Sequence, residues 1–198
     1  CMTVINHRFF AHRAFETTRL TQFILGWIGC LAYQQGPMWW AVKHRRHHRT
    51  CDTPDDPHSW VQTNYMYAWI GWTMDPKEGL IEEEYLGALS KFPELWLCDR
   101  FWFAPPMALT YGLWKWGMHP AYPLMVMLTC RLITLHFNCV FHPPEGEELC
   151  EYVVGGASKT CRAIDVMRGP VDFISDAVGE AHHDDHHVHP SRAKRPGR

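Results

Sequence analysis

The sequence has no excess of basic residues. Its 19 Lys and Arg stand against 21 Asp and Glu, which gives a net charge of -2. Proteins that bind nucleic acid normally carry a basic surface, because they must neutralise phosphates. The charge balance therefore argues against a nucleic-acid partner.

Closely spaced cysteine pairs are also absent. The eight cysteines are scattered singly along the 198 residues, with no Cys-x-x-Cys motif. This scatter is typical of reduced thiols in a cytosol-facing protein, not of a disulfide scaffold. No signal peptide, internal repeat or low-complexity tract is recognisable, and the first residue is Cys1. We therefore expect residues 1–198 to be one partial domain from inside a longer chain.

Long apolar runs are missing from the first hundred residues. The segment 19–42 is apolar only from Phe23 to Tyr33, whereas a membrane-spanning helix needs about 20 residues. We expect a buried or interfacial helix there, a break at Gly36 and Pro37, and a second helix from Trp39 to Arg49.

The apolar signal is strongest in residues 101–141. Two apolar arms, of 18 and 21 residues, are separated by His119 and Pro120. Their lengths predict a helical hairpin through a bilayer, although a core hairpin of a soluble protein is the alternative. We expect a loop over 143–170 and a last helix over 171–187.

Histidine is abundant, with 14 residues, and most of it is clustered. His47 and His48 follow His44 by three and four positions, so on a helix the three share one face. His183, His186 and His187 repeat these offsets. Two such faces would enclose a divalent ion, which imidazoles bind in the neutral form.

Other histidines give weaker signals. His7 and His12 are five apart, about 140° on a regular helix, so only a bend or a helix end would bring them together. Asn138 and His142 lie four apart, on one face of the apolar hairpin. Nine histidines suit two ions with four or five ligands each; they are His7, His12, His44, His47, His48, His142, His183, His186 and His187. The remaining five are expected to be caps, interface residues or satisfied polar groups: His58, His119, His136, His182 and His189.

The pattern resembles the membrane-bound acyl desaturases, especially the delta-9 acyl-CoA branch, over most of the chain. The segments "HRFFAHR" and "HRRHH" are similar to the first two histidine boxes of that family. The segment "GEAHHDDHH" is similar to the third box, and "DTPDDPHS" to the family's Asp-x3-Asp-Pro-His stretch.

The resemblance implies an all-α membrane helical bundle with a cytosolic helical cap that holds a dimetal site, here without the preceding transmembrane hairpin. It implies two Fe2+ ions, with O2 as co-substrate. One iron would take His7, His12, His48 and His187, with Asn138 near it through water; the other would take His44, His47, His142, His183 and His186. Gln34, Trp40 and Thr134 would line a bent acyl tunnel.

The activity that the resemblance implies is the introduction of a cis double bond into a fatty acyl chain, on acyl-CoA or an acyl lipid. Electrons would come from cytochrome b5 or a ferredoxin. The protein would sit in the endoplasmic reticulum or a bacterial cytoplasmic membrane, with its metal site facing the cytosol. The alternatives are a di-iron acyl or alkyl hydroxylase and a non-catalytic, histidine-rich metal-binding membrane protein. A ferritin-like carboxylate site needs two Glu-x-x-His pairs, and we see one, Glu180 with His183.

Overall fold

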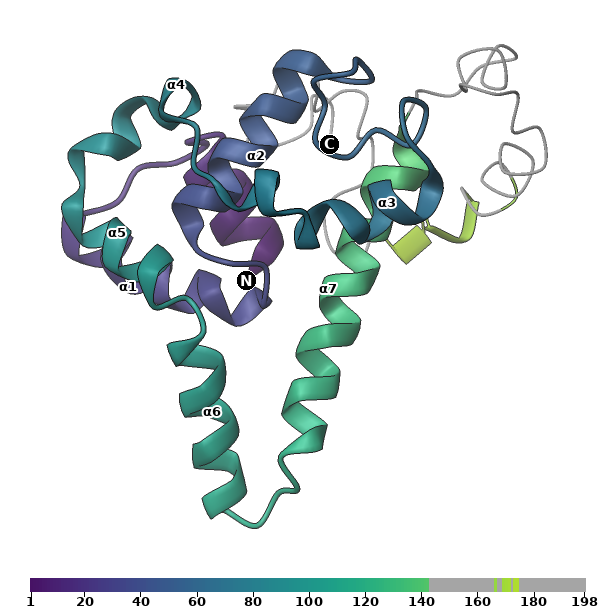
Figure 1. Ribbon diagram of the computed structural model, residues 1–198. Coiled ribbons are helices and arrows are strands. Elements are labelled where there is room, and N and C mark those ends of the chain that lie inside the picture. Colours follow the sequence, from purple (N-terminus) through teal and green to yellow (C-terminus); the bar gives the residue numbers. More distant parts are fainter. Residues whose placement is uncertain (143–165, 167–168, 172, 175–198) are drawn as a thin grey trace. The chain divides into compact units, whose positions relative to one another are not determined.

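The computed structural model describes residues 1–142, 166, 169–171 and 173–174 (Figure 1). Every regular element within these residues is a helix, which confirms the all-α expectation for them. The elements are η1 (Met2–Ala11), α1 (Arg19–Gly29), η2 (Cys30–Ala32), α2 (Pro37–Thr50), α3 (Tyr65–Trp69), η3 (Gly71–Met74), η4 (Pro76–Gly79), α4 (Glu83–Leu86), η5 (Gly87–Lys91), α5 (Pro93–Arg100), α6 (Ala104–Lys115) and α7 (Ala121–Phe141).

The described residues fall into two compact units. Unit 1 contains Cys1–His44 and Ile81–Ile133, and unit 2 contains Arg45–Leu80 and the described residues from 134 onward. Helices α2 and α7 each contribute residues to both units.

The core of unit 1 forms where η1 meets α2 and α5. Phe9 and Phe10 of η1 pack in one buried cluster with Met38 and Val42 of α2 and with Leu95 of α5. All five side chains are almost fully buried. Burying a large apolar side chain contributes about 1.5–3 kcal/mol, so this cluster holds η1 and α2 in fixed register.

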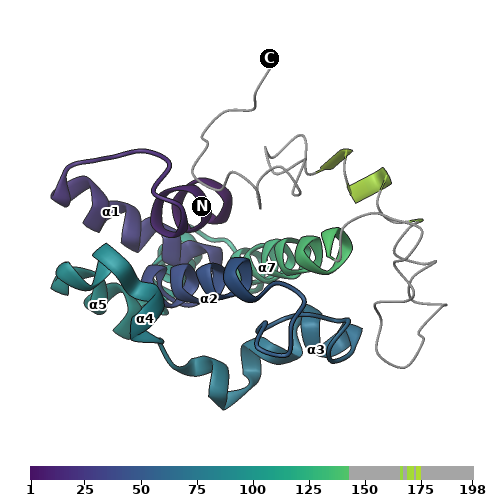
Figure 2. The ribbon, with the colours of Figure 1, turned by 90° about the horizontal axis from the view of Figure 1, so that it is seen from above.

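Helices α1 and α5 lie side by side in both views (Figures 1 and 2). The hydroxyl of Thr18 accepts a hydrogen bond from the backbone amide of Thr21, which caps the start of α1. Gly26 of α1 allows the close approach, because a Cβ there would lie 3.1 Å from the Cys98 sulfur of α5. The expected helix in this segment is thereby confirmed, with α5 as its partner.

The start of α2 is fixed by a carboxylate from α5. Asp99 accepts hydrogen bonds from the backbone amides of Met38 at 3.0 Å and Trp39 at 2.8 Å. Pro37 occupies the first helical position, where its missing N–H costs nothing. A Cβ on Gly36 would lie 2.4 Å from the Asp99 Cα, so only glycine permits this contact. The predicted break at Gly36 and Pro37 and the helix after it are confirmed.

The apolar hairpin is shorter in its first arm than expected. Helix α6 has 12 residues, not 18, because the chain turns at 101–103 and Gly117 adopts a φ of +93° after the helix ends. Helix α7 has 21 residues and alone among the described helices is long and apolar enough to cross a membrane. Figure 1 shows that α6 and the first part of α7 diverge from the turn that connects them.

Unit 2 has a separate core around the loop after α2. Trp60, Trp72 and Phe137 are buried there, and the Trp60 indole donates a hydrogen bond to the carbonyl of His142. This bond fastens the loop to the residue that follows α7. The segment 51–59 consists of turns without a helix, as its proline and aspartate content predicts.

Candidate metal centre

Two histidines project from η1 although they are five residues apart. Helix η1 is a π-helix, whose N–H groups bond to the carbonyl five residues earlier. One such bond, 3.1 Å long, joins the His12 amide to the His7 carbonyl. The wider turn places both imidazoles on one side, with ring centroids 4.9 Å apart. The bend that this pair required is therefore a π-helix.

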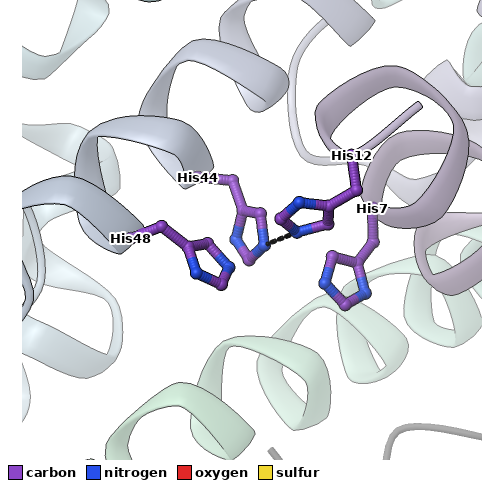
Figure 3. Close-up of side chains that lie close together, drawn as sticks. All are labelled: His7, His12, His44 and His48. Atoms are coloured by element: carbon purple, nitrogen blue, oxygen red, sulfur yellow. Dashed lines mark hydrogen bonds between the residues drawn. The ribbon is translucent and has the colours of Figure 1, made fainter. Parts of the chain in front are cut away.

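Helix α2 adds two histidines one turn apart, His44 and His48. The Nε2 atoms of His44 and His12 are 2.8 Å apart, and the ring centroids of His44 and His7 are 4.6 Å apart. One ligand nitrogen from each of His7, His12, His44 and His48 lies within 4.8 Å of the others. Figure 3 shows these four rings pointing toward one another from η1 and α2. We call them the first histidine group.

Two of the expected substrate residues adjoin this group. The Trp40 indole stacks on the His44 ring, with centroids 4.7 Å apart and planes 28° apart. Its Nε1 donates a hydrogen bond of 2.9 Å to the Oε1 of Gln34, which is buried. Trp40 therefore covers one face of a candidate ligand, and Gln34 fixes the angle of the indole.

A second group forms in unit 2. The Nε2 of His47 lies 3.3 Å from the Nε2 of His142, while its Nδ1 lies 2.9 Å from a carboxylate oxygen of Asp56. The His58 ring is 4.2 Å from the His47 ring, and the Cys51 sulfur is 3.2 Å from the His142 Nδ1. We call these five residues, His47, Cys51, Asp56, His58 and His142, the second histidine group.

Burial sets the protonation of several of these side chains. Burial raises the pKa of the Cys51 thiol, with the nearby Asp52 and Asp56 acting in the same direction. Burial lowers the pKa of His58, although Asp56 opposes the shift. At neutral pH Cys51 is therefore a thiol and His58 a neutral imidazole. Burial acts to raise the pKa of Asp52 as well, but hydrogen bonding with His142 and Ser59 lowers it overall, so Asp52 is a carboxylate.

The other sequence-predicted residues lie on α7 or outside the described residues. Asn138 and Thr134 are half-buried on α7, and His142 follows the end of that helix directly. The third cluster, His183, His186 and His187, lies outside the described residues, as do His182 and His189. Its part in a metal site stays a prediction.

The two histidine groups do not match the assignment of histidines to two irons that the resemblance implied. His44 lies with His7 and His12, whereas the resemblance assigned it to the other iron, with His47 and His142. The reason is local: the three histidines share one broad face of α2, but His47 is rotated about 100° from His48 and lies against His142 instead. Which histidine would bind which iron stays a prediction.

Three members of the second histidine group were not among the candidate ligands. His58 was expected to be a cap, an interface residue or a satisfied polar group; it is buried beside His47, with its Nδ1 4.0 Å from a carboxylate oxygen of Asp56. The signal was present in the "DTPDDPHS" segment, where Asp56 and His58 are two residues apart. Cys51 carried no signal, because nothing in its neighbourhood predicts contact with a histidine 91 positions away. His119 and His136 do form hydrogen bonds, with the Ala121 amide and the Tyr65 hydroxyl.

The donor sets fit transition-metal ions. Imidazole nitrogen suits iron and zinc, and the first histidine group offers four imidazoles with no carboxylate among them. In the second histidine group, Asp56 faces the Nδ1 of His47, which is the usual arrangement around a metal-binding histidine. Buried imidazoles that crowd in this way would repel one another as cations, and a bound ion removes that cost.

Comparison with known proteins agrees with this geometry. The family model described as fatty acid desaturase matches residues 1–194. A probable chloroplastic lipid desaturase of Arabidopsis thaliana is 28% identical over 148 residues, which cover 72% of this chain and 41% of the relative. The sn-2 palmitoyl-lipid 9-desaturase of Nostoc sp. is 26% identical over 193 residues, covering 95% of this chain and 64% of the relative.

A third relative shares a shorter and more similar stretch. The acyl-CoA 5-desaturase of Anemone leveillei is 35% identical over 75 residues, which cover 38% of this chain and 23% of the relative. No solved structure matches the chain. The chain thus spans less than two thirds of the length of each of these relatives. Because the family model covers nearly its whole length, the chain belongs to the fatty acid desaturase family.

Proposed function

We propose that the protein is a membrane-bound, O2-dependent fatty acyl desaturase that uses two iron ions to introduce a cis double bond. The observation that carries the proposal is the convergence of His7, His12 and His44 from two separate helices into one group of imidazoles. Membership of the desaturase family supports the assignment of iron chemistry to that group. In this proposal His47 and His142 of the second histidine group, with Asn138 through water and the third cluster, complete the ligand set.

Each part of the chain would have a distinct task. Iron and O2 supply the oxidising chemistry that unactivated methylenes require, because side-chain acids and bases do not remove their hydrogens at a useful rate. The predicted ligand histidines of both groups would hold the ions. Trp40 and Gln34, which are joined by a hydrogen bond beside His44, border the acyl chain and keep it in place. Thr134 of α7 is a further proposed contact with the chain.

The position of the acyl chain relative to the ions would decide where the double bond forms. Adjacent methylenes differ little in intrinsic reactivity, so the pair that reacts must be the pair held beside the ions. We propose the delta-9 position, which the name of the Nostoc relative also carries. The relatives act on acyl groups in lipids and on CoA, and we propose acyl-CoA for this chain.

The membrane assignment rests on exposed apolar surface. Only 28% of the most apolar stretch of α7 is buried, and Val126 and Met125 are among its exposed side chains. Large apolar patches on a protein surface mark contact with a membrane or a partner. We propose that the 101–141 hairpin enters the bilayer of the endoplasmic reticulum or a bacterial cytoplasmic membrane. The metal site would then face the cytosol, where cytochrome b5 or a ferredoxin delivers two electrons per turnover.

The test is to express the full-length parent in a host that lacks its own desaturase and to analyse its fatty acids by mass spectrometry. We expect a new monounsaturated chain with a cis double bond at carbon 9, and at least a hundredfold loss of product in His44→Ala. His119→Ala is the matched control, because His119 is exposed and outside both groups. It should retain full activity.

Three results would contradict the proposal. A hydroxylated acyl chain would identify a hydroxylase. Bound metal without O2 consumption, in the presence of reductant and acyl substrate, would identify a non-catalytic metal-binding protein. Product formation by an iron-free preparation would exclude the metal centre altogether.

A further inference from the structure

We propose that Asp56 is a positioning residue of the second histidine group: its carboxylate fixes the tautomer of His47, so that Nε2 of His47 is the atom offered to a metal ion. The inference rests on the proposed function, because it assumes that His47 is a metal ligand. It concerns a residue that does not itself bind the ion.

The geometry of the pair is closely defined. The Oδ2 of Asp56 lies 2.9 Å from the Nδ1 of His47, and the side chains of both residues are almost completely buried. On the other side of the ring, the His47 Nε2 lies 3.3 Å from the His142 Nε2. The carboxylate and the other candidate ligand therefore contact opposite nitrogens of one imidazole.

The chemistry of the carboxylate and the imidazole determines which nitrogen of His47 carries the proton. A carboxylate only accepts hydrogen bonds, so the nitrogen that faces it must carry the proton. In a neutral imidazole the other nitrogen then has the lone pair. Asp56 thus assigns the proton of His47 to Nδ1 and leaves Nε2 as the donor atom. Such carboxylate partners also increase the basicity of a ligating histidine.

Backbone hydrogen bonds hold Asp56 itself in place. Its Oδ2 also accepts from the backbone amide of Asp52 at 2.9 Å, and its Oδ1 accepts from the amide of His58 at 3.0 Å. The loop after α2 is closed around this carboxylate. Asp56 therefore cannot rotate away from His47 without breaking two backbone bonds, and it is preorganised for the role.

Asp56→Asn separates a positioning role from a merely structural one. The amide has nearly the shape of the carboxylate, and its oxygen can still accept from the His58 amide, but the NH2 group that replaces Oδ2 no longer accepts from the Asp52 amide. Its NH2 group, however, would face the His47 Nδ1 and donate to it. The preferred proton position would then move to Nε2, and the lone pair would no longer be offered to the ion.

The experiment titrates purified, metal-free, full-length protein in detergent micelles with Fe2+ under anaerobic conditions, with Co2+ as a spectroscopic substitute. We expect two ions in the wild type. In Asp56→Asn we expect one of the two to bind about 10–100-fold more weakly, the usual effect of losing such a partner. Asp55→Asn makes the same chemical change one residue earlier at an exposed site, and it should bind both ions as the wild type does.

A second measurement needs no variant at Asp56. In the metal-free wild type with 15N-labelled histidine, NMR spectra assigned by comparison with His47→Gln should show the His47 proton on Nδ1. A proton on Nε2 would overturn the inference, and so would unchanged affinity for both ions in a folded Asp56→Asn. If the wild type bound no iron at all, the proposed function would fail first and the inference with it.

Discussion

At the scale of single residues, a buried ion pair stands next to the first histidine group. Lys43 precedes His44 on α2, and 2% of its side chain is exposed. Its ammonium donates to both carboxylate oxygens of Glu82, at 2.6 and 2.8 Å. A buried charge of this kind is tolerated only with a partner, so Glu82 helps to keep this turn of α2 in the core.

The prediction for this pair concerns stability. Glu82→Ala removes the carboxylate from beside a buried ammonium and should lower the free energy of unfolding by about 3–5 kcal/mol. Chemical denaturation of the detergent-solubilised full-length protein measures the change. Glu83→Ala, an exposed neighbour, should change stability by less than about 0.5 kcal/mol. Equal effects of the two substitutions would show that the pair contributes nothing.

A further prediction at this scale concerns His12. Its Nε2 faces that of His44 across the first histidine group, so His12→Ala should lower the iron content of the purified full-length protein by about one ion and abolish desaturation. Elemental analysis together with product analysis measures both effects. Full iron loading in this variant would remove His12 from the ligand set.

At the scale of helices, the contact between α5 and the start of α2 positions both histidine groups, because α2 carries residues of each. Burial raises the pKa of Asp99 to about 6, although the Trp39 and Met38 amides oppose that shift. In the unfolded chain the carboxyl has an ordinary pKa of 3.8. Between these values the folded protein binds more protons than the unfolded chain, so the Asp99 contribution to stability falls as pH rises through this window.

Asp99→Asn should therefore remove part of the pH dependence. The Tm of the wild type, measured in detergent from pH 4 to 7, should fall relative to that of the variant as pH increases. Glu94→Gln on the same helix is the control, because hydrogen bonding to Arg19 lowers the pKa of Glu94 to about 2 and its contribution has the opposite sign. Parallel curves for wild type and Asp99→Asn would contradict the argument.

The close approach of Gly36 to Asp99 gives a second test of the same contact. Gly36→Ala would place a Cβ 2.4 Å from the Asp99 Cα, which the backbone must relieve by moving. We expect a loss of about 1–3 kcal/mol in the free energy of unfolding, typical of overpacking. Gly112→Ala on α6, where a Cβ would meet nothing within 4 Å, is the matched control and should be neutral or stabilising.

At the scale of the whole molecule, the question is what covers the apolar surface of α6 and α7. Many large side chains on these helices are exposed, including Trp114, Tyr111 and Leu124. If a bilayer covers them, the full-length protein should stay in the membrane fraction after alkaline carbonate extraction. Val126→Arg, a charge on the exposed side of α7, should reduce insertion, since an arginine within a span costs up to about 2.5–3.5 kcal/mol. Release of the wild type by carbonate would contradict the assignment.

Much of this architecture could be predicted from the sequence. The apolar run of α7, the break at Gly36 and Pro37 and the helical spacing of His44 and His48 are local patterns, and the helices follow them. The first arm of the hairpin was predicted too long, because composition alone does not show the turn before α6. The position of Lys43 in the core was also not predictable, since its carboxylate partner is 39 residues away.

The sequence by itself determined the histidine clusters, which follow from residue types at short, regular spacings, and through them the resemblance to a family whose all-α fold the described residues share. Only the tertiary structure decided that a π-helix brings His7 and His12 together, that His44 joins them, and that Asp56 and His58 lie against His47. The physical reason is that short-range spacing determines which face of a helix a side chain occupies. Which faces then meet depends on packing between segments that are distant along the chain.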